Sequence, residues 1–378
     1  MARMTQPRLV VLTAVVGTLV AGIIALVTFG AQASARPDGV PVAVAVPDGG
    51  PAATQLRAAA GMLAERAGEQ LDVEVTSPQR AMALLDDKDV YGILRLTVEG
   101  GSPSATVVVS GAVNPAGTQV AELALTGARQ ALLGQLAQRV PGAVAGPVEL
   151  QQVHPTSLSA RAVPLAVVAV AWLGCLVAGA ALTFLAQRSG VRIGAAGRIA
   201  SGIAASVLVT GLIVGYVALW DATLPLGWDV VGLILLTSLA FALVQGGLLH
   251  LAGVKAMALL GPLYLVAPAV TNQVPELLHP GYRAALWSWT PFRFPAEALR
   301  SLFAGTTEAP DVMLAVWVLT GMLLAGLVLL AVPRRSARKQ AEAHPPDGVI
   351  NVGVDETDRL PGAERERSAE HRDRRVRR

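Results

Sequence analysis

Six long apolar stretches dominate the pattern of this 378-residue chain. A helix that crosses a lipid bilayer needs about 20 consecutive, mostly apolar residues. The stretches that reach or approach this length are residues 9–30, 163–186, 199–220, 230–252, 256–274 and 312–332. The pattern therefore predicts a polytopic α-helical membrane protein with about six transmembrane helices.

Between the first two apolar stretches the pattern changes to short strands and amphipathic helices. Ser77 and Pro78 are typical of a helix start, as N-cap and first helical residue. We expect a turn at Gly100-Gly101-Ser102-Pro103. The predicted strands are 40–46, 72–76, 91–98, 105–111 and 148–153, and the predicted helices are 52–71, 77–85 and 116–140. The order, βαβαββα(β), predicts one α/β domain within residues 31–160, a normal size for a single core.

Composition agrees with burial in lipid. The chain is 53% hydrophobic and 15% charged, whereas soluble domains carry about 25% charged residues. Its single cysteine, Cys175, excludes an intrachain disulfide and any cysteine-based metal cluster. The net charge of +3 is small, and it gives little support to a nucleic-acid partner.

The placement of basic residues predicts the orientation, because Lys and Arg gather in cytoplasmic loops. With six crossings both termini are cytoplasmic, and 31–162 and 221–229 lie outside. The segment 275–311 does not fit this rule, since it should also lie outside and yet carries Arg283, Arg293 and Arg300. The residues that agree are Arg3, Arg8, Arg188, Arg192, Arg198, Lys255, Arg334, Arg335, Arg338 and Lys339.

The first apolar stretch has two interpretations. Ala33-Ser34-Ala35 resembles a signal-peptidase site that follows an Arg-flanked apolar segment. The apolar core of a signal peptide is about 7–15 residues long, and this stretch is longer. An uncleaved membrane anchor is favoured over a cleaved signal.

The sequence offers little catalytic chemistry. No Gly-x-x-x-x-Gly-Lys-[Ser/Thr] motif occurs, so the chain has no phosphate-binding loop of its own. We expect no catalytic residue, metal or cofactor. Asp86, Asp87 and Asp89 read as a solvated helix end rather than a cation site, and His154 as a lone surface histidine. The stretches also lack interior charges, which argues against an ion-coupled pump; His250 is taken as interfacial.

Small residues at four-residue spacing predict close contacts between helices. They are Gly174 with Ala178, and Gly211 with Gly215.

Three segments carry a resemblance to a known family. They are VPVAVAVPDGG (40–50), SPQRAMALLDDKDVYGILRL (77–96), and 261–305 with its Pro275-Glu276, Pro291-Phe292 and Ala298-Leu299-Arg300. With the order of one span, an α/β domain and five spans, they resemble the permease subunits of ABC-2 type exporters, particularly the YhgE/Pip (phage infection protein) family. The resemblance extends to about residue 335. The outer domain lacks the long coiled-coil insertion of larger members, so a role in phage adsorption is not carried over.

The resemblance implies two candidate sites. The loop 188–198 would contact a separate ATPase, through Arg188, Arg192 and Arg198, although a purely topological role explains the same charges. The segment 275–310 would be a re-entrant or interfacial element before the last span, acting as a static anchor or as a gate. Within it Glu297 and Arg300 are spaced to pair, and the aromatic residues favour the interface. Its candidate residues are Trp287, Trp289, Pro291, Phe292, Arg293, Glu297 and Arg300.

The predicted organisation is a cytoplasmic N-terminus (1–8), a first span (9–30), the extracytoplasmic α/β domain, a five-helix domain (163–332) and a disordered cytoplasmic tail (333–378). The resemblance implies an exporter permease in a bacterial plasma membrane. It would form a homodimer or heterodimer, use a separate ATP-binding-cassette subunit, and move a hydrophobic or amphipathic substrate. The alternative is a non-transporting scaffold or receptor of a secretion or envelope complex.

Overall fold

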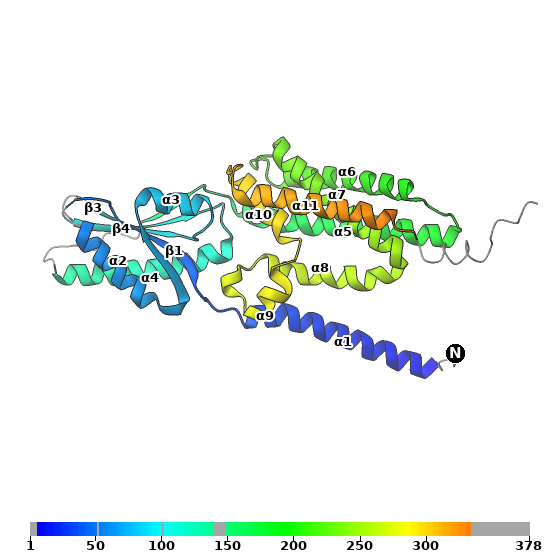
Figure 1. The fold of residues 1–378 in the computed structure, drawn as a ribbon, viewed down its shortest axis with the longest axis horizontal. Coiled ribbons are helices and arrows are strands. Elements are labelled where there is room, and N and C mark those ends of the chain that lie inside the picture. The colour runs from blue at the N-terminus through cyan, green and yellow to red at the C-terminus, as the bar shows by residue number, and fades with distance from the viewer. Residues whose placement is uncertain (1–5, 51–52, 100–101, 140–148, 334–378) are drawn as a thin grey trace, which may run out of the picture. The chain divides into compact units, whose positions relative to one another are not determined.

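The structure is a computed structural model that describes residues 6–50, 53–99, 102–139 and 149–333. Residues Met1–Pro333 form one compact unit. Within it, an α/β domain follows the first helix, and a helical domain follows the α/β domain (Figure 1). The predicted tail, apart from Pro333, lies outside the described residues. The same is true of Arg3 near the N-terminus and of the basic residues that follow residue 333.

The α/β domain is built on a five-stranded mixed sheet with the order β2-β1-β3-β4-β5. Strand β1 pairs in parallel with β2 and β3, β3 and β4 are antiparallel, and β4 is parallel to β5. The strands are β1 Val40–Ala45, β2 Leu71–Thr76, β3 Ile93–Glu99, β4 Ser102–Ser110 and β5 Leu150–Val153.

Helices cover both faces of this sheet (Figure 1). Alternate residues of β1 face opposite sides, so Val42 and Val44 pack with α2 (Ala53–Ala67) and α4 (Pro115–Arg139). Ala43 and Ala45 pack with α3 (Pro78–Asp86). Burial on both sides explains why β1 is a continuous apolar run rather than an alternating one.

The predicted order of strands and helices is confirmed in this domain. The Ser77 side chain caps α3 by accepting a hydrogen bond of 3.3 Å from the Arg80 amide. The expected turn was too long, because Ser102 and Pro103 belong to β4 and pair with Glu99 and Val98. Pairing across the hairpin extends the ladder beyond the apolar run from which the strand was predicted. Residues 100 and 101 lie outside the described part.

The helical domain contains four helical segments that are long and apolar enough to cross a membrane: Leu158–Ser189, Ala195–Trp220, Trp228–Leu265 and Pro310–Ala331. This supports a polytopic helical membrane protein, while the count of six spans remains a prediction. The helices are α1 Gln6–Ala33, α5 Leu158–Ser189, α6 Ala195–Trp220, α7 Trp228–Ala252, α8 Met257–Thr271 and α11 Pro310–Ala331.

A short turn divides the third of these segments into the two helices expected from the sequence. The 3-10 turn Gly253–Ala256 separates α7 from α8, and Gly253 has a φ of 63°, which favours glycine. Helix α8 then runs back along α5 and α1 (Figure 1).

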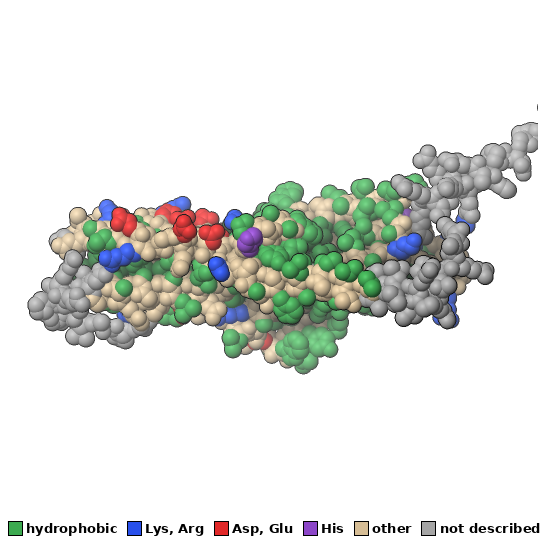
Figure 2. Space-filling view, turned by 90° about the horizontal axis from the view of Figure 1, so that it is seen from below, with side chains coloured by type: hydrophobic (Ala, Val, Ile, Leu, Met, Phe, Trp, Pro, Cys, Tyr) green, Lys and Arg blue, Asp and Glu red, His purple; other side chains and the backbone are tan. Residues whose placement is uncertain are grey.

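The outer surface of the helical domain is apolar. Leu208, Leu219 and Val328 are 74%, 77% and 64% exposed. Figure 2 shows hydrophobic side chains spread over this part, whereas most acidic side chains on the same face lie over the α/β domain. Such a surface suits contact with lipid rather than with water.

Close helix contacts centre on α7, which packs against α5, α6 and α11. A Cβ atom at Gly326 of α11 would lie 2.5 Å from the Leu243 backbone. The predicted contact at Gly174 is confirmed, because a Cβ there would lie 2.8 Å from the side chain of Val209. At Gly211 and Gly215 a Cβ would meet nothing within 4 Å, so these two glycines make no close contact with other described residues.

We predict that Gly326→Val separates α7 from α11 and lowers the free energy of unfolding by about 1–3 kcal/mol, since backbone atoms cannot yield to the added methyl groups. Gly321→Val on the same helix is the control, because a Cβ there meets nothing within 4 Å. Thermal unfolding of both variants in detergent measures the difference. Equal stability of the two variants would contradict the packing described.

Candidate functional site

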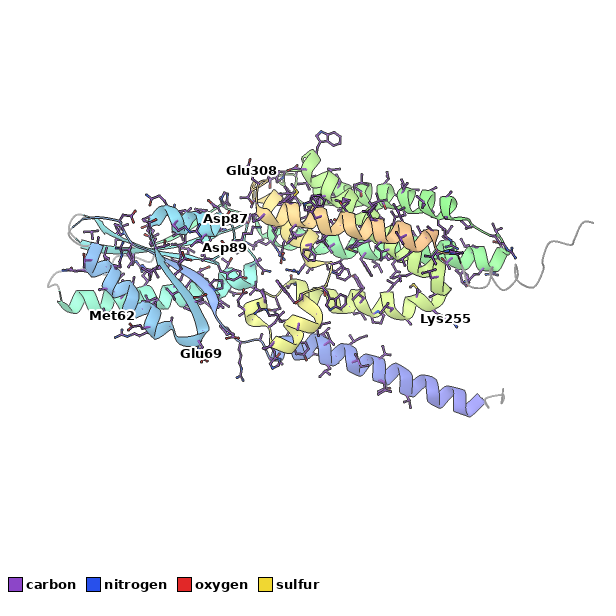
Figure 3. All side chains as sticks on the ribbon, in the orientation of Figure 1. Met62, Glu69, Asp87, Asp89, Lys255 and Glu308 are labelled. Atoms are coloured by element: carbon purple, nitrogen blue, oxygen red, sulfur yellow. The ribbon has the colours of Figure 1, made fainter. Side chains whose placement is uncertain are left out.

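The turn after α3 carries a lysine into the helical domain. Lys88 has a φ of 65°, an uncommon conformation for a residue other than glycine. Its Nζ lies 2.6 Å from Oδ2 of Asp311, at the start of α11. The Ser301 hydroxyl donates to the same oxygen at 2.7 Å and is also in contact with Nζ. Figure 3 shows the neighbouring Asp87 and Asp89 on this turn. The pair joins residues 223 positions apart.

This ion pair is largely withdrawn from water. The two side chains are 16% and 13% exposed. Burial lowers the pKa of the Lys88 amine below its ordinary value of 10.5, and the attraction of Asp311 opposes this change. A pair of this kind contributes little net stability, but the loss of one partner leaves a costly buried charge.

A second contact joins Tyr91 to the segment after α8. The Tyr91 hydroxyl donates to Oε2 of Glu276 at 2.9 Å. Burial, followed by the nearby charge of Glu276, raises the pKa of Tyr91, so the phenol stays a donor. The amides of Arg36 and Asp38 donate to the carbonyls of residues 277 and 276, at 3.2 and 3.0 Å. Val40, Val274 and Leu277 form an apolar cluster beside them.

Helix α10 (Arg293–Phe303) supplies the other wall of the junction. Its charged residues Arg293, Glu297 and Arg300 lie at spacings of four and three, which places them on one helix face. Helices α5, α7, α8 and α11 surround α10. The Arg293 guanidinium lies 3.8 Å from the centroid of the Trp287 ring and 4.2 Å from that of Phe294, a stacking arrangement that arginine favours.

A cavity of about 200 Å³ lies between this charged face and the Lys88 turn. Its charged lining residues are Asp87, Lys88, Arg293, Glu297, Arg300 and Asp311. Burial lowers the pKa of Arg300, which is only 4% exposed. The expected pairing of Glu297 with Arg300 is not seen, because no ion pair within 4 Å joins these two described residues. Arg300 lines the junction cavity.

The predicted interfacial role of the aromatic residues is wrong for Phe292 and Phe294, which are 1% and 9% exposed. The centroid of the Phe292 ring lies 4.7 Å from that of Trp172 and 5.7 Å from that of Phe241, in an aromatic cluster inside the helical domain. Only Trp289 stays open, at 55% exposure; Trp287 and Pro291 are intermediate. The sequence could not show that α5, α7 and α11 cover this face of α10.

The three arginines of the basic loop 188–198 differ in their exposure to solvent. Arg188 ends α5 and Arg192 lies in the following loop, and both are exposed. Arg198 is only 8% exposed and lines a small cavity with Thr183 and Cys175. Since α6 begins at Ala195, Arg198 falls on the inner side of its first turn. The prediction that Arg198 is available to a partner is therefore wrong, while Arg188 and Arg192 remain candidates.

The remaining candidates also have partners. His154, expected to be alone, has Nε2 3.4 Å from Oδ1 of Asp86 on the surface. His250 lies near the end of α7, with Nε2 3.1 Å from the Val332 carbonyl oxygen. Within the described ranges no three His, Cys, Asp or Glu residues are grouped as metal ligands would be.

Sequence reasoning gave no role to Lys88, Tyr91 and Asp311, which close the junction together with Glu276. The signals were the concentration of charge at 86–89, beside a helix end, and the Pro275-Glu276 pair. Nothing in the spacing of the chain indicates that this turn meets α11.

The comparisons with known proteins were negative: no protein-family model, no curated protein and no solved structure matches this chain. The case for a function therefore depends on the sequence and on the geometry described above.

We predict that Lys88→Met destabilises the fold by about 3–5 kcal/mol, because it leaves the Asp311 carboxylate buried without a partner. The double variant Lys88→Met/Asp311→Leu should recover most of this loss. Unfolding of both variants in detergent tests the pair. Asp86→Asn, which removes the exposed partner of His154, is the control, with a change below about 1 kcal/mol. A double variant that is no more stable than Lys88→Met would show that Lys88 and Asp311 do not form the ion pair described.

We also predict a pH dependence that comes from Glu297. Burial raises the pKa of this carboxyl above its ordinary 4.5, despite the attraction of Arg293 and Arg300. Its contribution to stability is then complete below the unfolded pKa and is lost as pH rises through the folded pKa. Glu297→Gln should therefore gain stability relative to wild type as pH rises through that window.

Melting temperatures measured between about pH 4 and 8 test this expectation. Glu308→Gln is the control, since Glu308 is exposed on the loop before α11 (Figure 3). Parallel curves for wild type and Glu297→Gln would show that this carboxyl does not titrate as described.

Proposed function

We propose that this chain is the permease subunit of an ABC-2 type exporter of the YhgE/Pip kind, in a bacterial plasma membrane. A separate ATP-binding-cassette subunit supplies the energy, and two permease subunits form the pathway. The α/β domain is extracytoplasmic, and both termini are cytoplasmic. The substrate is hydrophobic or amphipathic.

The observation that carries this proposal is the arrangement of charge along the helical domain. Arg188, Arg192 and Lys255 are exposed at the end where α5 finishes and α8 begins. Glu308 lies towards the other end (Figure 3). Asp311, the partner of Lys88, follows it three residues later. By the positive-inside rule, the basic end is cytoplasmic and the α/β domain is outside.

The contacts of Arg293 and Arg300 inside the protein are compatible with this orientation. Their position in an outside segment seemed to oppose it. Arg300 is buried and Arg293 stacks on two aromatic rings, so both have structural roles in the junction. Only Arg283 of the three remains exposed.

Helix α5 provides the route by which ATP hydrolysis would reach the outside. Its 32 residues extend roughly 48 Å at 1.5 Å per residue. Arg188 lies in its last turn, while Trp172 in its interior contacts Phe292, directly before α10. A displacement of α5 by the partner would press on α10 and thus on the Lys88–Asp311 junction. In this proposal α10 is a gate rather than a static anchor.

The scaffold alternative has one observation in its favour. A cavity of about 380 Å³ lies between α2 and α4 on the α/β domain, lined mostly by apolar and small residues such as Met62, Leu63 and Ala128. Figure 3 shows Met62 on α2. A peptide segment of an envelope protein would fit such a groove.

The test is affinity purification of the tagged protein from mild detergent, followed by mass spectrometry of the proteins that accompany it. We expect an ATP-binding-cassette protein with wild type and at least tenfold less of it with Arg188→Ala/Arg192→Ala, because an exposed basic contact is lost. Lys255→Ala is the control, since Lys255 is exposed at the same end of the helical domain.

The other outcomes are equally informative. If Arg188→Ala/Arg192→Ala recovers as much of the ATP-binding-cassette protein as wild type does, the permease proposal stands and the 188–198 loop is excluded as the contact. Recovery of secretion or envelope proteins without any ATPase would replace the permease by the scaffold.

A further inference from the structure

The junction cavity contains an excess of hydrogen-bond donors. Asn114 Nδ2, Trp287 Nε1, Arg293 Nε, and Nε and Nη1 of Arg300 find no hydrogen-bond acceptor in the part of the chain that the structure describes, and all four residues line this cavity. Among the fully buried side-chain atoms of the described lining residues, Oδ1 of Asp311 is the one acceptor without a donor. The carboxylate of Glu297, which is partly exposed, also lines the cavity. Buried polar groups nearly always find partners, so the lining is suited to a group that accepts several hydrogen bonds.

The donor assignments are well defined. Asn114 Oδ1 accepts from the Ala116 amide at 3.0 Å, which leaves the amide nitrogen as the remaining group. The indole and guanidinium nitrogens can only donate. Neutral water would use its two donor hydrogens poorly here, whereas the oxygens of a carboxylate or phosphate only accept.

The charged lining residues balance formally, three basic against three acidic, but they are buried to different degrees. Lys88 and Asp311 neutralise each other at 2.6 Å. Of the other charged lining residues, Asp87 is exposed to solvent, and Glu297 lies on the same face of α10 as Arg293 and Arg300 and attracts both. Arg300 is the most deeply buried of them, at 4% exposure. Tyr91 also lines the cavity, and its hydroxyl is already bound to Glu276. Arginine with buried, unused donors is the residue best suited to oxyanion recognition.

The helix that begins at the cavity adds a further favourable contribution. Helix α11 starts at Pro310, which lines the cavity, and no side chain of the described residues caps its N-terminus. The N-terminus of a helix attracts negative charge. At about 200 Å³, the cavity has room for a group of several atoms, since one water needs only about 10–15 Å³.

We propose that this cavity binds an oxyanion, a carboxylate or a phosphate, held by Arg300 with Trp287 and Asn114. The source is either a free small anion or the headgroup of an anionic lipid at the membrane surface. Binding would join the α3 turn to α10, and it does not depend on transport.

The experiment uses the full-length protein in phosphatidylcholine nanodiscs. Its melting temperature is measured with inorganic phosphate or succinate, against chloride at equal ionic strength. A second series replaces part of the lipid by phosphatidylglycerol. A ligand that binds only the folded state raises the melting temperature. A rise with the free anions identifies a soluble ligand, and a rise only with phosphatidylglycerol identifies a lipid headgroup; either supports the site.

Two variants test the residues. Arg300→Gln should weaken the apparent affinity at least about tenfold, as expected for the loss of charged hydrogen bonds. Trp287→Phe removes one donor but keeps a ring beneath Arg293, and it should weaken the affinity about threefold. Arg283→Gln, at an exposed arginine of the same segment, should leave it unchanged.

Three results would overturn the proposal. One is a wild-type melting temperature that no oxyanion and no anionic lipid raises. Another is an equal loss of affinity in Arg283→Gln and Arg300→Gln, which would indicate nonspecific attraction. If Arg300→Gln does not fold, an unchanged affinity in Trp287→Phe decides against the site.

Discussion

Withdrawal of charged side chains from water at one junction is the constraint on which the arrangement of this chain depends. Lys88 reaches across 223 positions to Asp311, and Ser301 completes the contact. An ion pair of this kind is weak evidence for stability. It nevertheless disfavours other arrangements of the two domains, because either charge is costly to bury without the other. It therefore specifies where the α/β domain meets the helical domain.

The character of α10 follows from the same constraint. Helix α10 carries charged residues on one face, and apolar residues such as Phe294 and Leu302 elsewhere. Such a helix cannot be surrounded by lipid on all sides, because its charged face would be buried in hydrocarbon. In the structure its charged face borders the junction cavity, and most of its other side chains are buried among the helices. The arginines that seemed to contradict the orientation of the segment are thus part of its packing.

The aromatic cluster of Trp172, Phe241 and Phe292 connects this junction to the rest of the helical domain. Trp172 belongs to α5, the helix that ends at the exposed basic loop. A single helix, α5, therefore lies between the two regions that we assign to coupling and to the outside. The proposed export function uses this continuity, and the proposed oxyanion site lies at its far end.

The sequence by itself determined the local elements. Strand β1, the capped start of α3 and the apolar helices follow from periodicity and from Ser77 and Pro78, because these depend on neighbouring residues alone. The sequence also marked segment 275–310 as unusual. It did not show that Phe292 and Arg198 are buried, or that Glu297 and Arg300 form no ion pair within the described residues. Only the tertiary structure decided which helix faces are covered and that Lys88 meets Asp311. Those outcomes depend on contacts between residues far apart in the chain, which leave no signal in local spacing.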